Sequence, residues 1–226
     1  MGSYLNPGNF SFRGSLRSKI YIDKSKLIAR TNEALCTEQK YICVSRPRRF
    51  GKSMAANMLA AYYDRSEHTN ELFENLKISK DQSYRENLNR YDVIKINIQE
   101  FLSMTGTVEE MLEMLKNYLI SDFKEAYPKI LLRDEKNLIQ VMKDVFSYTK
   151  CPFVILIDEW DCLFREYKQD KEEQKKYLDF LRAWLKDKDY VALAYMTGIL
   201  PIKKYGSHSA LNMFTEYSMT HPREMA

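Results

Sequence analysis

The sequence lacks the long apolar segments that place a protein across a membrane. None of its hydrophobic runs reaches the ~18 residues that a spanning helix needs. The opening stretch, Met1 to Pro7, has no basic start, apolar core and small-residue cleavage site in series, so it does not resemble a secretory signal. Its four cysteines are far apart, with no C-x-x-C pair and no neighbouring histidine, which argues against a zinc site or a disulfide framework. We therefore expect a cytoplasmic protein with reduced cysteines and no membrane partner.

The sequence also lacks a large excess of positive or negative charge. The 226 residues include 35 basic and 31 acidic ones, and a net charge of +4 is too small to predict nucleic acid as a partner. Hydrophobic residues make up 45% and charged residues 29%, which are the proportions of a globular protein. Glycine is scarce, with seven residues where average usage gives about 16. Gly51 and Gly198 therefore each require a local reason.

Hydrophobic patterning predicts one unit in which strands alternate with helices. After an irregular start and a short apolar run at residues 20–22, which suits an edge element or a cap, the pattern predicts a helix over about 24–35. Strands are predicted at 41–44, 91–98, 153–157 and 191–196. Further helices are predicted at 52–63, 108–126, 135–148 and 172–185. This alternation predicts a three-layer α/β fold with a mostly parallel sheet, and we divide the chain into an N-terminal cap of residues 1–36 and a core of residues 37–226.

The sharpest motif is the stretch from Ser45 to Ser53, which lies between a predicted strand and a predicted helix, as a phosphate-binding loop requires. Gly51 would let the backbone approach a phosphate without a Cβ clash, beside the amides that open the helix. Lys52 would reach the β- and γ-phosphates of a nucleotide, and the Ser53 hydroxyl would bind Mg²⁺. The match to G-x-x-x-x-G-K-[ST] is incomplete, because Arg46 occupies the first glycine position. On this fragment alone, an ordinary basic helix start is the alternative.

Two adjacent carboxylates, Asp158 and Glu159, follow the continuously apolar strand predicted at 153–157. The carboxyl edge of an open α/β sheet is where its ligands bind. There, Asp158 is placed to hold Mg²⁺, and Glu159 to orient and deprotonate an attacking water. The alternative is a solvated helix cap. Thr197 ends the last apolar strand in the same way, so its hydroxyl would sense the γ-phosphate or the water, although Thr197 and Gly198 together also suit a strand-ending turn.

These residues resemble the AAA-ATPase-like family of bacterial P-loop proteins, and the resemblance covers nearly the whole chain. It rests on four blocks: Tyr21 to Ser25, Arg46 to Ser53, Leu156 to Asp161, and Thr197 to Ile202 with Ser209 to Asn212. The second block, the Walker A motif, is the most specific, because this family writes its phosphate loop as R-P-R-R-F-G-K-S. In the third block, the Walker B motif, Trp160 stands where tyrosine is usual. The resemblance implies that nucleotide is bound by Arg46, Pro47, Arg48, Arg49, Phe50, Gly51, Lys52, Ser53 and Met54.

The resemblance also implies a fold and a partner. The fold is a P-loop NTPase core of the additional-strand (ASCE) type, in which the Thr197 strand lies between the Walker B strand and the phosphate-loop strand. Similar proteins usually continue into a helical lid and a nuclease-like domain of the PD-(D/E)XK type. The chain stops at Ala226 without a second carboxylate constellation. We therefore expect the ATPase module alone, with a downstream nuclease-like domain or another protein as its partner.

The leading functional hypothesis is a Mg²⁺-dependent ATPase that binds ATP. Its catalytic residues are Lys52, Glu159 and Thr197, and its metal ligands are Ser53 and Asp158. ATP is preferred to GTP because the chain has no N-K-x-D motif. The first alternative is a switch that binds ATP, turns over little and reports to a partner.

The second alternative is a nucleic-acid-binding module that uses the arginines of the loop. Since Lys52 and the helix start already serve the phosphates, we expect at least one of Arg48 and Arg49 to face away from nucleotide, toward a partner.

Overall fold

The chain folds around a sheet of five parallel strands, and the structure, a computed structural model, describes residues 2–202 and 210–218. The strands follow the order β2-β3-β4-β1-β5, and every neighbouring pair is parallel. Their bounds are β1 Tyr41–Ser45, β2 Asp92–Asn97, β3 Phe153–Asp158, β4 Val191–Gly198 and β5 Thr215–Tyr217. Since β4 lies between β1 and β3, the strand order predicted by the resemblance is confirmed.

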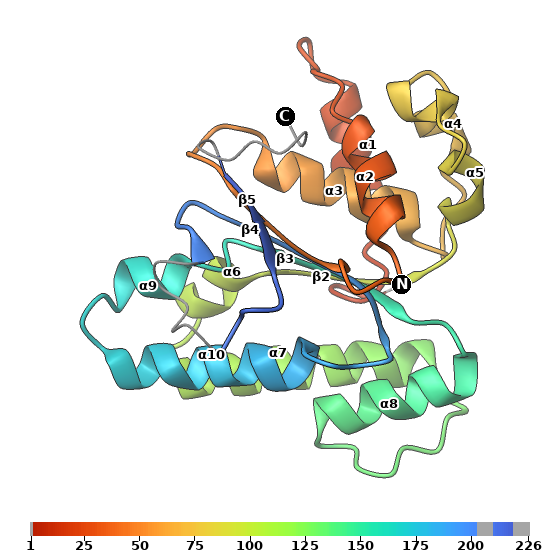
Figure 1. The fold of residues 1–226 in the computed structure, drawn as a ribbon. Coiled ribbons are helices and arrows are strands. Elements are labelled where there is room, and N and C mark those ends of the chain that lie inside the picture. The colour runs from red at the N-terminus through yellow and green to blue at the C-terminus, as the bar shows by residue number, and fades with distance from the viewer. Residues whose placement is uncertain (1, 203–209, 219–226) are drawn as a thin grey trace.

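Helices cover both faces of the sheet, so the fold has three layers (Figure 1). One face carries α1 Phe10–Leu16, α2 Lys26–Ala34, α3 Lys52–Tyr63, α4 Asn70–Phe73, the 3₁₀ helix η1 Lys77–Lys80 and α5 Tyr84–Asn87. The other face carries α6 Ile98–Ser103, α7 Val108–Ala126, α8 Leu138–Thr149, α9 Cys162–Glu166 and α10 Lys171–Leu185. The three-layer α/β fold predicted from the sequence is therefore confirmed.

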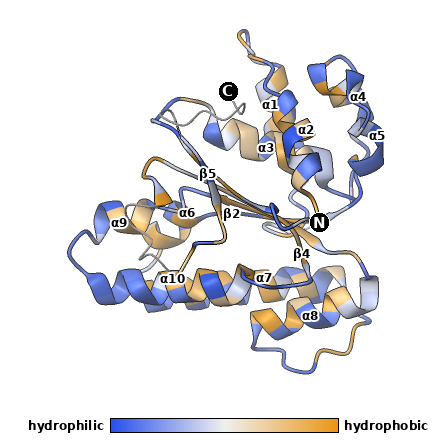
Figure 2. Cartoon of the chain, in the orientation of Figure 1, coloured by the Kyte–Doolittle hydropathy of each residue, from blue (hydrophilic) through white to orange (hydrophobic). Residues whose placement is uncertain are grey.

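The central strands are apolar up to Asp158 and Thr197 near their carboxyl ends, because both of their faces are covered. All six residues of β3 and all eight of β4 are buried. Alternate side chains of β3 enter different cores: Val154 and Leu156 join the core beneath α3, and Ile155 and Ile157 join the core above α7. Figure 2 shows the hydrophobic strands in the middle and long hydrophilic stretches on the outer helix α10. By the same alternation, Asp158 continues the α3 side of the sheet.

The long elements match the predicted ranges closely, and the short ones were missed. The bounds of α3 and α7 are those predicted, whereas α8 begins three residues late, where the Asn137 side chain accepts a hydrogen bond from the Gln140 N–H. The run at residues 20–22 is neither strand nor helix, and Ile20 and Ile22 are exposed, so it is not an edge strand, and the alternative of a cap stays a prediction. Within the described residues, no helix combines the length and the apolar character needed to cross a bilayer.

The first residues of the chain lie along β2. An antiparallel bridge joins Leu5 to Ile94, and the Leu5 side chain is buried in the core that α7 covers. The neighbouring Asn6 donates through its amide to Asp92 at 2.8 Å and accepts from the Val93 N–H at 2.8 Å. The division into a cap of residues 1–36 and a core stays a prediction.

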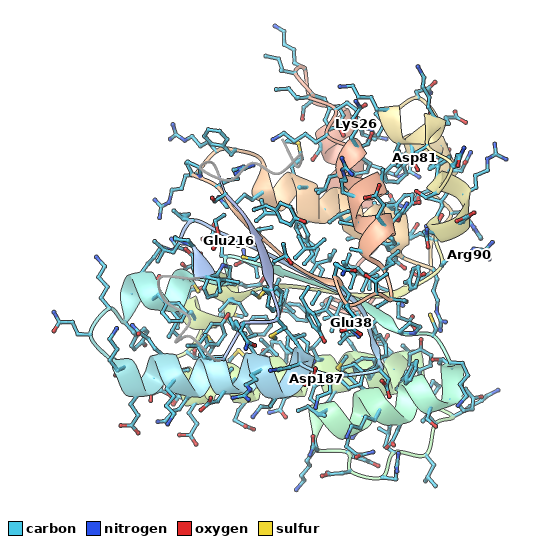
Figure 3. All side chains as sticks on the ribbon, in the orientation of Figure 1. Lys26, Glu38, Asp81, Arg90, Asp187 and Glu216 are labelled. Atoms are coloured by element: carbon cyan, nitrogen blue, oxygen red, sulfur yellow. The ribbon has the colours of Figure 1, made fainter. Side chains whose placement is uncertain are left out.

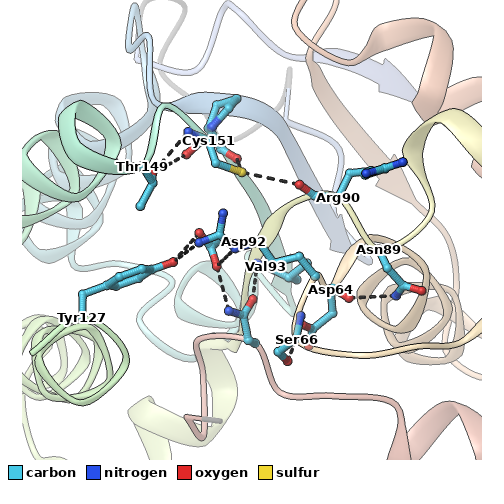
Figure 4. A network of polar contacts seen from close by, with 12 residues as sticks. Asp64, Ser66, Asn89, Arg90, Asp92, Val93, Tyr127, Thr149 and Cys151 are labelled. Carbon is cyan, nitrogen blue, oxygen red and sulfur yellow. Dashed lines mark hydrogen bonds and ion pairs between the residues drawn. The ribbon is translucent and has the colours of Figure 1, made fainter.

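A buried polar network fixes the start of β2 (Figure 4). Besides the Asn6 amide, the Asp92 carboxylate contacts the Arg65 guanidinium at 2.9 Å and accepts from the Tyr127 hydroxyl at 2.6 Å. Burial, together with the charge of Asp92, raises the pKa of the Tyr127 phenol, which keeps it a hydrogen-bond donor. This network lies at the amino end of β2, away from the carboxyl edge where ligands bind. Its contacts join the N-terminal segment, β2, the segment after α3 and Tyr127, the residue that follows α7.

Candidate functional site

The candidate site lies at the carboxyl ends of the central strands. The register aligns the ends of β1 and β4, because Val44 pairs with Thr197 and Ser45 with Gly198. The first peptide of the loop continues this pairing, since the Arg46 N–H donates to the Gly198 carbonyl at 3.0 Å. The sheet therefore brings the loop that starts at Arg46 to the same edge as the end of β4.

Two left-handed residues shape the loop between β1 and α3. Arg49 has φ 69° and Gly51 has φ 75°, which is a conformation that glycine adopts without strain. Gly51 precedes α3, and its carbonyl accepts the first helical hydrogen bond, from the Ala55 N–H at 2.9 Å. No side chain caps the N-terminus of α3. The first amides of α3 are thus available to an anion, and this is the local reason for Gly51.

Lys52 folds back across the loop. Its side chain is buried, and its ammonium donates to the carbonyls of Arg46 at 3.1 Å and Pro47 at 3.0 Å. An ammonium has three donors, so one is left for a ligand. The next residue, Ser53, is exposed on the first turn of α3, and its hydroxyl has no hydrogen-bond partner in the described part of the chain. The loop thus presents a cation and a hydroxyl side by side.

Asp158 and Thr197 form a buried pair at the ends of β3 and β4. The Thr197 hydroxyl donates to Asp158 Oδ1, which also accepts from the Glu159 N–H at 3.0 Å. Both side chains are almost completely shielded from solvent. Among the described residues, Asp158 Oδ2 has no hydrogen-bond partner. Thr197 therefore orients the carboxylate and leaves one of its oxygens available to a ligand.

Glu159 leaves the line of the strand through a left-handed backbone, with φ 53°. Its carboxylate accepts a hydrogen bond from the Arg165 guanidinium on α9. The two side chains are 24% and 19% exposed, so solvent screens this pair only in part. Arg165 also lies 3.6 Å from Asp161, one helical turn before it. Glu159 is thus held beside the strand end by a residue that sequence reasoning did not single out.

The loop between β1 and α3 carries several positive charges that no carboxylate of the described residues pairs with. Arg48 and Arg49 are exposed, whereas Arg46 is half-buried and its Nη1 atom is shielded from water without a hydrogen-bond partner. In residues 2–202 and 210–218, no carboxylate forms an ion pair with these arginines or with Lys52. Because a buried donor without a partner is costly, the loop favours an anionic ligand at this position.

Comparison with known families agrees with this geometry. The family described as predicted AAA-ATPase matches residues 12–207. The chain belongs to the predicted AAA-ATPase family. No curated protein matches it. The P-loop NTPase-like arrangement of the fold and the family assignment support each other.

In this AAA-ATPase family member, Asp161 joins the turns that follow β3 and β4. Its carboxylate is fully buried, and Oδ2 accepts from the Ile199 N–H at 3.0 Å and the Leu200 N–H at 2.8 Å. The Trp160 N–H donates to the Thr197 carbonyl at 3.1 Å. The third sequence block and the start of the fourth, Thr197 to Leu200, are therefore parts of one structural unit.

Gly198 is required by space and not by backbone conformation. Its φ is not in the left-handed region, so backbone strain does not demand glycine here, and β4 ends at this residue with a bend after it. A Cβ at this position would lie 2.6 Å from Trp160 Nε1 and 2.7 Å from Asp161 Oδ1. Real Cβ atoms do not approach other atoms so closely, and both neighbours are fully buried. The backbone of β4 therefore needs glycine to pack against these two side chains.

We expect Gly198→Ala to destabilise the protein, because the buried Trp160 and Asp161 have no room to move away. Overpacking of this kind costs about 1–3 kcal/mol, and each kcal/mol lowers the melting temperature of a domain of this size by about 2–4 °C. The matched control is Gly14→Ala in α1, where a Cβ meets nothing within 4 Å. That control is expected to be neutral or slightly stabilising. Thermal unfolding checks both, and equal melting temperatures for the two variants would contradict the packing argument.

Two basic residues near the site were missing from the sequence predictions. Lys95 on β2 is half-buried; burial lowers the pKa of its ammonium, whereas the carboxylates of Asp158 and Glu100 favour the charged form. Arg165, described above, forms ion pairs with both Glu159 and Asp161. The i,i+4 spacing of Asp161 and Arg165 was a visible signal for one of these contacts. No comparable signal in the sequence joins Lys95 to the site.

Proposed function

We propose that this chain binds ATP with Mg²⁺ and hydrolyses it. One observation carries the proposal: the buried Asp158–Thr197 pair lies at the same sheet edge as the cationic, uncapped start of α3. Alternation along β3 places Asp158 on the α3 side of the sheet, the side on which the loop begins its helix. A polyphosphate at the start of α3 would therefore lie between the cations of the loop and the carboxylate of β3.

In this proposal the phosphates are held by the loop. The amides at the start of α3 face the anion, and the Lys52 ammonium supplies its remaining donor. The buried Nη1 of Arg46, which has no partner, gains one when an anion binds. These groups are donors only, so they favour the polyanionic end of a nucleotide over any neutral ligand.

The donor set also fits Mg²⁺. Ser53 and Asp158 would hold the ion, since a hydroxyl and a carboxylate are the hard oxygen ligands that it prefers. Across the described residues there is no group of three or more histidine, cysteine, aspartate or glutamate side chains suited to a metal. Phosphate oxygens and water would therefore complete the coordination. When bound, the ion would neutralise charge on the phosphates and orient them.

Glu159 is the proposed general base. It follows Asp158 directly, and its carboxylate is partly exposed at the edge where the γ-phosphate would lie. Its role is to accept a proton from the attacking water and to orient that water. Thr197 supports the site by holding Asp158, to which its hydroxyl donates a hydrogen bond.

The contact between Glu159 and Arg165 favours a second candidate function, a nucleotide-dependent switch with little turnover. In this state a guanidinium engages Glu159 Oε2, and its positive charge makes the carboxylate a weaker base toward water. A chain that stays in this state would bind ATP and report its presence without hydrolysis. The partner proposed from the resemblance is a downstream nuclease-like domain or another protein. Arg48 and Arg49, both exposed, are free to face it.

Lys52→Ala tests the nucleotide site directly. Removing the ammonium takes away a charge-assisted hydrogen bond worth about 1.5–3 kcal/mol, so we expect affinity for Mg²⁺-ATP to fall by about 10- to 150-fold. Calorimetric titration with ATP and with a non-hydrolysable analogue measures the affinity, and phosphate release is followed in the same samples. Lys143→Ala on α8, an exposed lysine on the other face of the sheet, is the control. A Lys52→Ala variant that binds and hydrolyses ATP like the parent would rule the proposal out.

A further inference from the structure

The segment Asp23-Lys24-Ser25 approaches the phosphate loop from outside the core motifs. The Lys24 ammonium donates to the Phe50 carbonyl at 2.7 Å, although the two residues are 26 positions apart. The same Nζ atom lies 3.4 Å from the place where a Cβ on Gly51 would be. Lys24 thus touches the peptide that joins Phe50 to Gly51, directly before α3.

The residues on both sides of Lys24 are anchored elsewhere. Asp23 accepts from the Ser25 N–H at 2.8 Å and from the Lys77 N–H at 2.8 Å. The fully buried Ser25 accepts through its hydroxyl from the Ile78 N–H at 3.0 Å. Burial alone would raise the pKa of Asp23, but these hydrogen bonds lower it, so the carboxylate is a firm anchor. The backbone around Lys24 is therefore tied to the start of η1, and only its side chain reaches the loop.

Lys24 adds a further positive charge to a loop that is already cationic. The loop already carries Arg46, Arg48, Arg49 and Lys52, and within the described ranges no carboxylate pairs with any of these or with Lys24. Like charges repel, although solvent screens the repulsion in part because Lys24 is exposed. The Phe50 carbonyl holds the Lys24 ammonium at this place. A bound polyphosphate would relieve the remaining repulsion.

A cation on a carbonyl oxygen polarises the whole peptide group, because hydrogen bonds in a chain strengthen one another. The other end of this peptide is the Gly51 N–H, which has no hydrogen-bond partner in the part of the chain that the structure describes. Its position before α3 is where an anion meets the backbone. The order of groups is thus the Lys24 ammonium, the Phe50 carbonyl, the Gly51 N–H and the phosphate.

We propose that Lys24 is a positioning residue of the nucleotide site. Held by Asp23 and Ser25, it fixes and polarises the Phe50–Gly51 peptide so that the Gly51 N–H binds a nucleotide phosphate. This inference rests on the proposed function, since it requires a di- or triphosphate at the loop. It assigns to the first sequence block a role in affinity, separate from the hydrolytic groups on β3 and β4.

The test compares Lys24→Met, which keeps the apolar stem and removes the charge, with Lys24→Arg, which keeps the charge. We expect Lys24→Met to raise the Kd of both Mg²⁺-ATP and Mg²⁺-ADP about 5-fold, the factor that roughly 1 kcal/mol gives. Its kcat at saturating ATP should stay within about 2-fold of the parent, because the variant does not touch Asp158, Glu159 or Thr197. Lys24→Arg should restore the affinity. Lys26→Met, at the exposed first residue of α2 (Figure 3), is the matched control.

Thermal unfolding of each variant separates a positioning role from a purely structural one. A Lys24→Met variant with the parent's Kd overturns the inference, and so does one whose only change is a lower melting temperature with fewer active molecules. A parent protein that binds no ATP overturns both this inference and the proposed function. If the parent binds, Lys52→Ala weakens binding and Lys24→Met does not, the proposed function stands and only the role of Lys24 is lost.

Discussion

Glu159→Gln is expected to slow phosphate release by about 10²–10⁴-fold, which is the contribution of a positioned general base. The amide keeps the size of the side chain and can still accept a hydrogen bond from Arg165, so the local structure should persist. It cannot accept a proton from water at neutral pH. Affinity for Mg²⁺-ATP should stay within about 3-fold of the parent, since the proposed function assigns the phosphates to the loop around Lys52 and not to Glu159.

The control for this variant is Glu166→Gln, the same change on the exposed end of α9, where the carboxylate contacts Gln99. Single-turnover phosphate release and calorimetric titration, performed on the same preparations, separate the chemical step from binding. If Glu159→Gln hydrolyses ATP at the parent's rate, Glu159 is not the base. If the parent binds ATP and releases no phosphate, the switch is the better description of this chain.

The parts of the fold that could be predicted are those whose signal is local and long. β3 and β4 could be predicted as strands because they are apolar up to Asp158 and Thr197, and α3 and α7 as helices because their patterns extend over several turns. The order of the strands is not contained in those patterns. It came from the resemblance, which joins the loop and the carboxylate strand to one family arrangement.

The short elements could not be predicted, because each depends on packing. The helices α4 and α5 and the 3₁₀ helix η1 have four residues each, too few to show a helical period or to be stable alone. Each places one aromatic or aliphatic side chain, Phe73, Tyr84 or Ile78, in the core around α3. A single buried residue has no period to detect. In the same way, β5 has three half-buried residues and becomes a strand by pairing with β1.

The same distinction between local and distant signals applies to the candidate site. Lys52, Asp158 and Thr197 belong to sequence motifs, so they could be predicted as site residues. In the structure they lie at one edge of the sheet. The residues that support them were not predicted, because their partners are distant in the chain. Lys24 contacts Phe50 across 26 positions, and Asp161 contacts Leu200 across 39.

Asp161→Ala is expected to cost about 3 kcal/mol of folding stability, because two N–H groups lose their acceptor at about 1–3 kcal/mol each when they are left unsatisfied. For a domain of this size the melting temperature should fall by roughly 6–12 °C. The groups are the amides of Ile199 and Leu200, which Asp161 Oδ2 holds at 3.0 and 2.8 Å. Asp161→Asn keeps an oxygen acceptor at this place, so its loss should be about half as large. Asp179→Ala, an exposed aspartate on α10, is the control and should change stability by about 0.5 kcal/mol or less.

The same substitution also tests how far the end of β4 is held by the turn after β3. Asp161 holds residues 199–200 against that turn. These residues closely follow Thr197, whose hydroxyl donates to Asp158. Losing the link should loosen Thr197, so phosphate release should fall in Asp161→Ala even at temperatures where the variant is fully folded. Urea unfolding measures the stability, and activity is compared well below the melting temperature. If Asp161→Ala is as stable as Asp179→Ala, the carboxylate does not hold the two strand ends together, and another contact must keep Asp158 and Thr197 in place.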